Sequence, residues 1–354
     1  MSEAVVYSSL AGMETNFLSD VRNFEGSRAP FAHPEWVLSS IQSLGERYHQ
    51  KFVYLADRHG AALAPLCRRQ SWFGAYQQLG VSELGEPGEL LFSEALLDQM
   101  TDALAANRIP LNLHRVPATS PLIAAVKRSY CKSALILLRS RVGCPYITLS
   151  DRNTSLDSLL SSTIKRDLRR ARKRAEAMGT VAVEIHSPKN EAEFRPLWEQ
   201  LLDIEALSWK GETGTAMKAD SRILSFYENY TRAIYQRGEL RIFFLCIDGR
   251  PIAMQLVVVS NNCFWLLKIG YNAQYSKCSP GMLLMYEAMQ YAKKEGLESY
   301  EFMGYAKAWT RRWTLQERPN LAIFVYPYTV HGMALLGLDL LTSLGRRIQD
   351  ILLK

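Results

Sequence analysis

A turn suited to phosphate binding stands within residues 275–284, Tyr-Ser-Lys-Cys-Ser-Pro-Gly-Met-Leu-Leu. It follows an apolar run at 264–269 that predicts a strand, and it opens a long helical pattern. Ser279 can cap that helix through its hydroxyl, Pro280 suits the first helical position, and Gly281 lets a ligand approach the backbone. Helix N-termini bind anions through unpaired N–H groups and the helix dipole, although capped helices without a ligand are common. The candidate phosphate-binding residues are Ser279, Pro280, Gly281 and Met282.

A second group of chemically active residues lies on a helix predicted at 160–178. Apolar residues recur there at intervals of three and four, which places them on one face of the helix. The opposite face is basic and carries Lys165, Arg166, Arg169, Arg170, Arg172, Lys173 and Arg174. Two interpretations stay open. The face is either a solvated charged surface or an electropositive wall that binds an anionic substrate through Arg169 and Arg170.

The composition is that of an ordinary soluble globular protein, with 354 residues, 48% of them hydrophobic and 22% charged, and enough length for two domains. The formal charge of +7 is concentrated in residues 165–174, which favours an anionic ligand or a membrane surface over duplex binding. The six cysteines form no Cys-x-x-Cys pair, as expected for reduced core thiols of a cytosolic protein. The six histidines are scattered singly, so no metal site is predicted.

The order of predicted elements places the phosphate turn in the second half of the chain. Residues 1–142 predict an α/β domain without a counterpart of that turn, and a boundary is expected at 143–145. Beyond the basic helix the predicted order is β-α-α-β-β-β-α-β, with tight turns at Asp248-Gly249 and Asn261-Asn262. The strands are predicted at 181–186, 240–247, 252–260, 264–269, 299–303 and 321–326, and the helices at 191–207, 222–236 and 280–296.

This order resembles the core of the GNAT acyltransferases, and several short motifs resemble the CelD-type acetyltransferase family, a relative of the Fem peptidoglycan aminoacyltransferases. The motifs are His33-Pro34-Glu35-Trp36, Ser208-Trp209-Lys210-Gly211, Lys268-Ile269-Gly270-Tyr271-Asn272, Ser279-Pro280-Gly281, Tyr300-Glu301-Phe302-Met303-Gly304 and Trp309-Thr310-Arg311-Arg312-Trp313. The resemblance implies an α/β protein of two tandem GNAT-like domains, each a mixed central sheet flanked by helices. It implies a degenerate domain at 1–142, a more complete acyltransferase domain at 143–330 and an amphipathic C-terminal helix at 331–354.

The resemblance also implies the co-substrate. In the GNAT fold the pyrophosphate of coenzyme A binds between the fourth strand and the third helix, where this chain has Ser279, Pro280, Gly281 and Met282. Acetyl-coenzyme A, or another acyl-coenzyme A, is therefore expected, without a metal. The GNAT signature with Gln or Arg before Gly-x-Gly or Gly-x-Ala is missing, so this expectation rests on position. The chain also departs from the CelD-type pattern at Asn272 and Glu301, where Asp is common, and at Thr310, where Lys is common.

Acyl transfer requires a nucleophile that loses a proton, a polarised carbonyl and a leaving group that gains a proton. Glu301 is the candidate proton acceptor, because it lies on the strand predicted beside the phosphate-binding helix; its alternative role is to pair with a nearby arginine. Tyr271 is the candidate proton donor to a leaving thiolate, or it holds the substrate. A buried tyrosine whose hydroxyl has a structural partner is the alternative at that position.

Three further residues are candidates for substrate binding. Lys268 interrupts an apolar strand run, so its charge must reach solvent or an anion. Trp209 and Lys210 can shape the acceptor pocket, or Trp209 simply covers the core. Cys263 and Cys278 lie near the expected site, but no histidine accompanies them in sequence, so no covalent acyl-cysteine step is expected.

Three functions follow from these observations. The first is an acyl-coenzyme A-dependent N- or O-acyltransferase that modifies a small molecule or glycan, in particular a polysaccharide or cell-envelope precursor. The second is a Fem-like transferase that uses aminoacyl-tRNA, in which case the basic helix would meet RNA; otherwise no nucleic acid partner is expected. The third is an inactive assembly protein. Residues 1–16 do not resemble a signal peptide, and no apolar stretch reaches membrane-spanning length, so a cytoplasmic protein is expected. The C-terminal helix either packs back on the protein or lies at the inner face of the membrane.

Overall fold

The structure is a computed structural model that describes residues 5–7, 29–58, 60–69, 73–150, 155–208, 210 and 213–352, the last nine of these as backbone only. The chain forms two compact units. Unit 1 comprises Met1–Ser27, Phe31–Val142 and Pro319–Lys354, and unit 2 comprises Arg28–Pro30 and Gly143–Arg318. The chain thus enters unit 2 at Gly143 and returns to unit 1 at Pro319. Each unit is described by itself.

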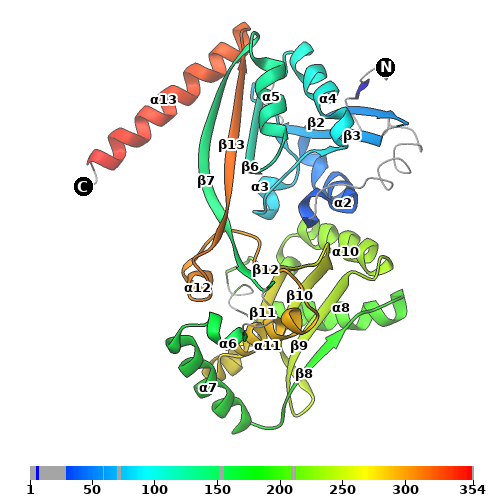
Figure 1. Cartoon of the computed structure of the whole chain (residues 1–354), viewed down its shortest axis with the longest axis vertical. Coiled ribbons are helices and arrows are strands. Elements are labelled where there is room, and N and C mark those ends of the chain that lie inside the picture. The colour runs from blue at the N-terminus through cyan, green and yellow to red at the C-terminus, as the bar shows by residue number, and fades with distance from the viewer. Residues whose placement is uncertain are drawn as a thin grey trace. The chain divides into compact units, whose positions relative to one another are not determined.

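Unit 2 is built on a mixed sheet with the strand order β7-β12-β11-β10-β9-β8 (Figure 1). The strands are β7 (Ala134–Thr148, from Gly143 in this unit), β8 (Val181–His186), β9 (Leu240–Ile247), β10 (Arg250–Ser260), β11 (Cys263–Tyr271) and β12 (Ser299–Glu301). Neighbouring strands are antiparallel except for β11 and β12, which are parallel. Left-handed backbone at Asp248-Gly249 and Asn261-Asn262 closes the two hairpins, as the turn residues predict.

The parallel pair in unit 2 is short. Strand β12 pairs only with Cys263, Phe264 and Trp265, the first residues of β11, whereas β11 continues to Tyr271. A bulge in the pairing between β10 and β11 falls between Leu256 and Val257. The C-terminal half of β11 therefore extends past its parallel neighbour, and among the described residues no other strand pairs with its edge on that side. This edge positions the candidate site.

Helices cover both faces of the unit 2 sheet. On one face α7 (Ser162–Glu176) and α11 (Pro280–Lys294) pack together, and α11 also contacts β9, β10 and β11. On the other face α8 (Glu191–Ala206) contacts β10 and β11, and α10 (Ser221–Gln236) contacts β9 (Figure 1). The remaining helical segments are α6 (Leu156–Leu159), η4 (Met217–Ala219), η5 (Ala273–Cys278) and α12 (Ala308–Arg311).

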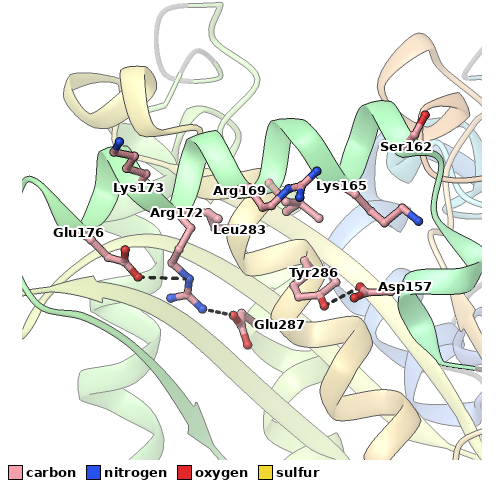
Figure 2. A pocket seen from close by; sticks show the side chains of 11 residues that line it. Asp157, Ser162, Lys165, Arg169, Arg172, Lys173, Glu176, Leu283, Tyr286 and Glu287 are labelled. Atoms are coloured by element: carbon pink, nitrogen blue, oxygen red, sulfur yellow. Dashed lines mark hydrogen bonds and ion pairs between the residues drawn. The ribbon is translucent and has the colours of Figure 1, made fainter.

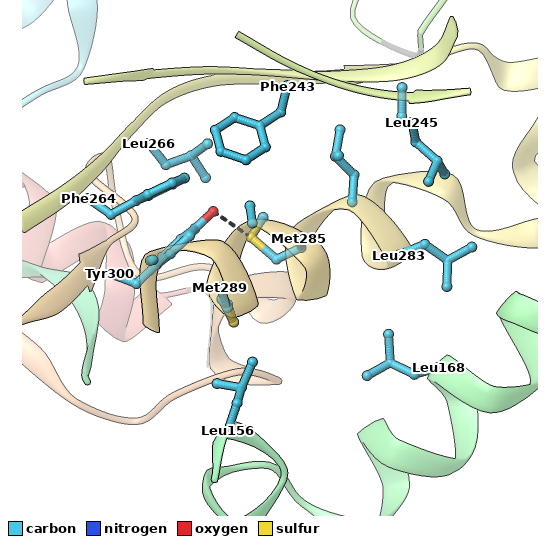
Figure 3. Close-up of a cluster of buried hydrophobic side chains, with 14 of the residues drawn as sticks. Leu156, Leu168, Phe243, Leu245, Phe264, Leu266, Leu283, Met285, Met289 and Tyr300 are labelled. Carbon is cyan, nitrogen blue, oxygen red and sulfur yellow. Dashed lines mark hydrogen bonds between the residues drawn. The ribbon is translucent and has the colours of Figure 1, made fainter. Parts of the chain in front are cut away.

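The core of unit 2 lies between the sheet and α7 and α11 (Figure 3). Phe264 and Tyr300 stack there with their ring centroids 4.5 Å apart. The buried Tyr300 hydroxyl is 3.0 Å from the sulfur of Met285 and donates to Oε1 of Gln255 at 3.2 Å. Figure 3 shows the sulfur of Met285, on α11, directed toward the Tyr300 hydroxyl. Because a buried phenol costs free energy unless it is hydrogen-bonded, Gln255 satisfies a core group as well as facing the pocket described below.

Unit 1 contains two sheets. One has the order β1-β2-β3-β4, with β5 also paired to β3, and the other contains β6, β13 and β7 as neighbours in that order. The strands are β1 (Val5–Tyr7), β2 (Tyr48–Asp57), β3 (Gly60–Arg69), β4 (Gln77–Gln78), β5 (Leu91–Phe92), β6 (Leu111–Pro117) and β13 (Glu317–Pro327). The helices are η2 (Pro30–Ala32), α2 (Pro34–Leu44), η3 (Gly45–Arg47), α3 (Val81–Leu84), α4 (Glu94–Ala106), α5 (Leu122–Tyr130) and α13 (Val330–Leu352).

The structure differs from the sequence-based expectation at the C-terminal end of unit 2. At the other end, the expected boundary at 143 coincides with the residue at which the chain enters unit 2, although the strand β7 runs through it to Thr148 instead of giving way to a loop. Strand β13, expected to belong to the C-terminal domain, pairs with β6, and its residues from Pro319 onward lie in unit 1. Strand pairing between distant segments produces both differences, and local composition does not report it.

The helix α13 was expected as an amphipathic segment at 331–354. Its described residues pack on unit 1 through Leu335 and Leu336, which contact the cluster of Ala322, Phe324 and Tyr326. The opposite face is exposed and apolar, with Val330, Met333, Leu340 and Leu341 among its residues. In the described part of the chain, no helix combines the length and the hydrophobicity needed to cross a bilayer.

Candidate active site

The predicted phosphate turn lies at the start of α11, but its helix cap differs from the expectation. Ser279 has left-handed backbone, with φ 49° and ψ 54°, and its side chain makes no capping hydrogen bond. Its carbonyl instead accepts from the N–H groups of Met282, at 3.0 Å, and Leu283, at 3.2 Å. The capping prediction was wrong because the chain enters α11 directly from η5 with Ser279 in the left-handed conformation, whereas a serine that caps through its side chain typically has extended backbone. Pro280 is the first helical residue, as predicted.

One N–H group of this turn is available for a ligand. The N–H of Ser279 is bonded to Ser276, and Pro280 has none. Within the described turn, Gly281 is left as the residue whose N–H has no carbonyl acceptor. A Cβ atom built on Gly281 would lie 3.4 Å from the nearest atom of the Tyr271 ring, which is an ordinary contact. The turn therefore presents one free amide and the helix dipole, next to Tyr271.

A pocket of about 430 Å³ opens at this point, here called the Tyr271 pocket. Tyr271, Ser279, Pro280, Gly281 and Met282 all line it, so the structure brings together one catalytic candidate and the four phosphate-turn residues. The other lining residues are Ile164, Met254, Gln255, Ile269, Gly270, Ser276, Leu284, Met285, Trp309, Arg312 and Trp313. They come from α7, β10, the open end of β11, η5, α11 and the segment around α12. Among the described residues that line it, none is acidic.

Glu301, the other catalytic candidate, lies elsewhere. Its side chain is 2% exposed and does not line the Tyr271 pocket. Nε of Arg318 donates to both carboxylate oxygens at 3.0 Å, and the Ser299 hydroxyl donates to Oε1 at 2.7 Å. The hydrogen bond to Glu301 raises the pKa of Arg318 above its usual range. The structure therefore places Glu301 in the alternative role, as the partner of an arginine.

The candidate substrate lysines also lie outside the pocket. Lys268 holds its ammonium 4.4 Å from the ring centroid of Tyr227, on α10. Lys210 is largely buried; its Nζ is 2.9 Å from Oε1 of Glu205 and donates to the carbonyl of Ile269 at 2.6 Å. Lys210 thus connects the end of α8 with β11. Trp209 lies outside the described residues.

Two departures from the CelD-type pattern have local structural roles. Asn272 is buried, and its Oδ1 accepts from the N–H of Gln274 at 3.0 Å, which caps η5. Thr310 is 1% exposed, and its hydroxyl exchanges hydrogen bonds of 2.9 Å with the backbone N–H and carbonyl of Lys307. A lysine at position 310 would bury a charge at the start of α12. The threonine at position 310 thus has a structural role, because its hydroxyl caps the start of α12.

The basic helix α7 forms a second pocket of about 670 Å³ with α6 and α11, here called the α7 groove (Figure 2). Arg169 lines it, whereas Arg170 is exposed and does not. Figure 2 shows Arg172 bridging two carboxylates; its guanidinium is 2.5 Å from Glu287 and 4.0 Å from Glu176. Within the described residues, the side chains of Lys165, Arg169, Arg170 and Lys173 have no acidic partner, so this surface carries uncompensated positive charge.

Some pocket residues were not predicted individually. Arg312, Trp309 and Trp313 belong to the motif at 309–313, but the motif by itself does not indicate that these side chains line a pocket. Gln255 could have been predicted as a pocket residue, since it is a polar residue inside the apolar strand run 252–260.

Cys278 is fully buried, and desolvation raises the pKa of its thiol, as it does for Cys263. A raised pKa makes both thiols poor nucleophiles. In the described residues, no group of three metal-ligating side chains occurs.

Comparisons with known proteins found a family match for the sequence and similar solved structures for the fold. Residues 162–311 match the family described as acetyltransferase (GNAT) domain. No curated protein sequence matches the chain. A solved structure of a conserved protein of unknown function from Bacteroides thetaiotaomicron is 11% identical and covers 91% of this chain and 99% of its own length, with a TM-score of 0.57.

Two further similar solved structures are of proteins that carry a name. The C-terminal domain of a putative lysylphosphatidylglycerol synthetase from Agrobacterium fabrum is 11% identical, with a TM-score of 0.56 over 92% of this chain and 94% of that domain. FemX is 11% identical, with a TM-score of 0.52 over 88% of this chain and 95% of that chain. At this identity the likeness shows the fold alone, and it confirms the predicted mixed α/β class. The chain is a two-unit α/β protein in which residues 162–311 form a GNAT acetyltransferase-like domain.

Proposed function

We propose that unit 2 transfers an acyl group from acyl-coenzyme A to an amine or hydroxyl of a glycan or cell-envelope precursor. One observation carries the proposal: the Tyr271 pocket brings the phenol of Tyr271, the free amide of Gly281 and the N-terminus of α11 together at the open edge of β11. This site offers a partner for each part of an acyl-coenzyme A donor. The helix N-terminus suits the diphosphate, the edge of β11 suits the amide-containing arm, and the Tyr271 hydroxyl suits the thioester.

The diphosphate would meet positive charge from three sources. The N-terminus of α11 supplies the dipole and the Gly281 amide. Arg174 lies close by, because its Nη1 donates to the carbonyl of Lys277 at 3.1 Å. Lys277 is exposed in the segment just before the turn. The free amide is a single one, so these two cations supply much of the attraction for the anion.

The arm and acyl group would occupy the inner part of the Tyr271 pocket. Its walls are largely apolar and include Met254, Ile269, Met282, Trp309 and Trp313. Apart from the Ile269 carbonyl, which accepts from Lys210, the edge of β11 beyond Trp265 offers backbone N–H and carbonyl groups that can pair with the amides of an extended arm as a neighbouring strand would. Apolar walls around the thioester exclude water and strengthen electrostatic interactions there.

Two side chains of the pocket suit the chemistry. As the nucleophile attacks, a C–N or C–O bond forms, the C–S bond breaks, and the departing sulfur must gain a proton. Tyr271 has an O–H that can supply that proton. Arg312 places a permanent positive charge at the wall, where it can stabilise the negative charge that develops on the carbonyl oxygen. Because no acidic side chain occurs among the described residues of this pocket, the nucleophile would pass its own proton to water.

A second donor, aminoacyl-tRNA, is favoured by a different observation. The uncompensated cations Lys165, Arg169, Arg170 and Lys173 form a basic face on α7, and the named structural relatives include FemX and a lysylphosphatidylglycerol synthetase. RNA bound by such a face would lose affinity steeply as salt rises, by a log–log slope of about −0.7 per phosphate contacted for single strands. Binding of acyl-coenzyme A should depend on salt far less, since it makes few phosphate contacts.

The test is calorimetric titration of the full chain with acetyl-coenzyme A, using wild type, Gly281→Ala and Gly281→Trp. The alanine methyl would make only an ordinary contact with Tyr271, so Gly281→Ala should bind as wild type does. The tryptophan side chain would fill the Tyr271 pocket and abolish binding. Titration with charged tRNA at several salt concentrations runs in parallel. If acetyl-coenzyme A does not bind wild type but charged tRNA does, the donor is aminoacyl-tRNA; if neither binds, the proposal is wrong.

A further inference from the structure

A third pocket of unit 2 has no role in the function proposed above. It has a volume of about 730 Å³ and is here called the Arg311 pocket. It is bordered by the end of β7, the segment between α6 and α7, and the chain from α12 toward β13. Its lining residues are Ile147, Thr148, Leu159, Ser161, Thr163, Ile164, Arg311, Arg312, Trp313, Thr314, Leu315 and Gln316.

The Arg311 pocket and the Tyr271 pocket have a common wall. Ile164, Arg312 and Trp313 line both of them. A molecule in each pocket would therefore contact the same side chains from two sides. A transferase needs two substrates whose reacting atoms approach to roughly 3 Å, so a second pocket that shares a wall with the donor pocket is the natural place for the acceptor.

The charge of the Arg311 pocket selects an anion. Arg311 and Arg312 line it, and none of the described residues that line it is acidic. Arg312 is paired with Asp167 at 2.9 Å. The side chain of Arg311 is 61% exposed, and its carboxylate neighbour, Glu317, lies 3.9 Å away, at the outer limit of an ion pair. Arg311 is thus the weakly compensated cation, and a phosphate or carboxylate could bind it in a bidentate manner.

The rim of the same pocket is apolar. Leu315 is 83% exposed and Leu159 is 41% exposed. Ile147 and the ring of Trp313 continue this surface inward. Exposed leucines beside an arginine favour a ligand with a hydrocarbon portion next to its charge, because covering them removes apolar surface from water.

Several polar groups of the pocket already serve its own walls. The Ser161 hydroxyl accepts from the N–H of Ile164 at 3.3 Å and caps α7. The Thr314 hydroxyl accepts from the N–H of Gln316 at 3.0 Å, and Oε1 of Gln316 accepts from the N–H of Thr148 at 3.3 Å. A neutral sugar would need many such groups for its hydroxyls. Their engagement favours recognition through charge and apolar contact instead.

We propose that the Arg311 pocket binds the acceptor, and that this acceptor is an anionic amphiphile, with a phosphate or carboxylate on Arg311 and its apolar portion against Leu159 and Leu315. The assignment of this ligand as the acceptor rests on the proposed acyl transfer. The binding of an anionic amphiphile does not depend on the proposed acyl transfer, so binding and transfer can be tested separately.

Dodecyl phosphate, titrated below its micelle concentration, is the probe. Inorganic phosphate and dodecyl maltoside are the comparison probes, since the first lacks the chain and the second lacks the anion. Wild type should bind dodecyl phosphate at least about tenfold more tightly than either, which corresponds to about 1.4 kcal/mol. Arg311→Gln should remove this preference over dodecyl maltoside, and Leu315→Ser should weaken dodecyl phosphate about threefold or more.

The control is Arg250→Gln, which removes an exposed arginine at the start of β10 that lies outside the Arg311 pocket and should leave binding unchanged. Arg311 and Leu315 are both exposed, so their variants should fold, as the thermal transition will show. The inference is overturned if dodecyl phosphate does not bind, if dodecyl maltoside binds equally well, or if Arg311→Gln binds as wild type does. Acetyl-coenzyme A binding by Arg311→Gln is measured alongside. If wild type also fails to bind acetyl-coenzyme A, the proposed donor is wrong, but the result with dodecyl phosphate still holds.

Discussion

Arg318 and Glu301 form a two-point contact, with Nε of the guanidinium 3.0 Å from both carboxylate oxygens and Nη2 2.5 Å from Oε1. The guanidinium also lies over the Tyr146 ring, 4.0 Å from its centroid. Glu301 is on β12 and Tyr146 is on β7, its antiparallel neighbour. The pair therefore joins the short strand β12 to the first residues of β13. The carboxylate of Glu301 thus already has hydrogen-bond partners and a counterion within the protein.

Glu301→Gln should reduce stability while leaving acyl transfer nearly unchanged. The amide cannot replace the charged contact with Arg318, and hydrogen bonds to charged groups contribute about 1.5–3 kcal/mol. Urea unfolding should show a loss of this size. The turnover number should change by less than about tenfold, whereas loss of a general base typically costs 10²–10⁴-fold. A fall of that size with normal stability would restore Glu301 as the catalytic base.

Tyr271→Phe should lower the turnover number by about 100-fold, the lower range for loss of a general acid. The ring that contacts the Gly281 position is kept, so the dissociation constant for acetyl-coenzyme A should not change. Steady-state kinetics and calorimetry measure the two quantities separately. An unchanged turnover number in a folded variant would remove Tyr271 from the chemistry.

Lys210→Met should destabilise the protein by about 3–5 kcal/mol, because it leaves the buried carboxylate of Glu205 without its cation. Lys218→Met is the matched control, since Lys218 pairs with Asp203 at 2.6 Å but both side chains are exposed. Exposed pairs contribute about 0–1 kcal/mol, so this variant should unfold close to wild type. Equal urea midpoints for the two variants would contradict the structural role of Lys210.

Thr310→Lys tests whether the departure from the CelD-type pattern has removed an activity. Thr310 is 1% exposed and caps α12, so the lysine should cost the cap, about 1 kcal/mol, and bury a charge in addition. Thr310→Ser keeps the hydroxyl and should retain most of the stability. Urea unfolding of both variants measures the difference. A gain in transfer rate in the lysine variant would show instead that the position handles substrate.

Stability should fall as the pH rises above about 9, in part because of Cys246. Burial raises the pKa of this thiol from 9.0 to about 12 in the folded protein. Between these values the unfolded chain has lost the proton that the folded chain retains, so the folded state binds more protons and the free energy of unfolding decreases with pH. One such proton contributes a slope of up to about 1.4 kcal/mol per pH unit. Urea unfolding at pH 8–11 under reducing conditions measures it.

Cys246→Ala should flatten this alkaline slope, whatever it does to stability at pH 7. Cys131→Ala replaces an exposed thiol and serves as the control, with a slope equal to that of wild type. An equal slope in Cys246→Ala would show that this thiol does not contribute to the alkaline loss of stability.

The sequence by itself determined the elements that depend on neighbouring residues. The strand β8 has the predicted bounds Val181–His186, and β9 the predicted Leu240–Ile247. The turns at Asp248-Gly249 and Asn261-Asn262, and the start of α11 at Pro280, also lie where predicted. Apolar periodicity and turn chemistry act over a few residues, so they can be read along the chain. The placement of Tyr271 beside the phosphate turn follows from the same local logic, since only a short segment separates them.

Tertiary structure alone decided the partners of the charged residues and the membership of the pocket. Glu301 meets Arg318, Lys268 meets the ring of Tyr227, and β13 pairs with β6, each across a separation that no local pattern encodes. Arg312 and Trp313 reach the Tyr271 pocket for the same reason. Whether a charge finds a ligand or a structural counterion is fixed by which distant segments pack together, because burial makes an unpaired charge costly and the fold supplies the nearest partner.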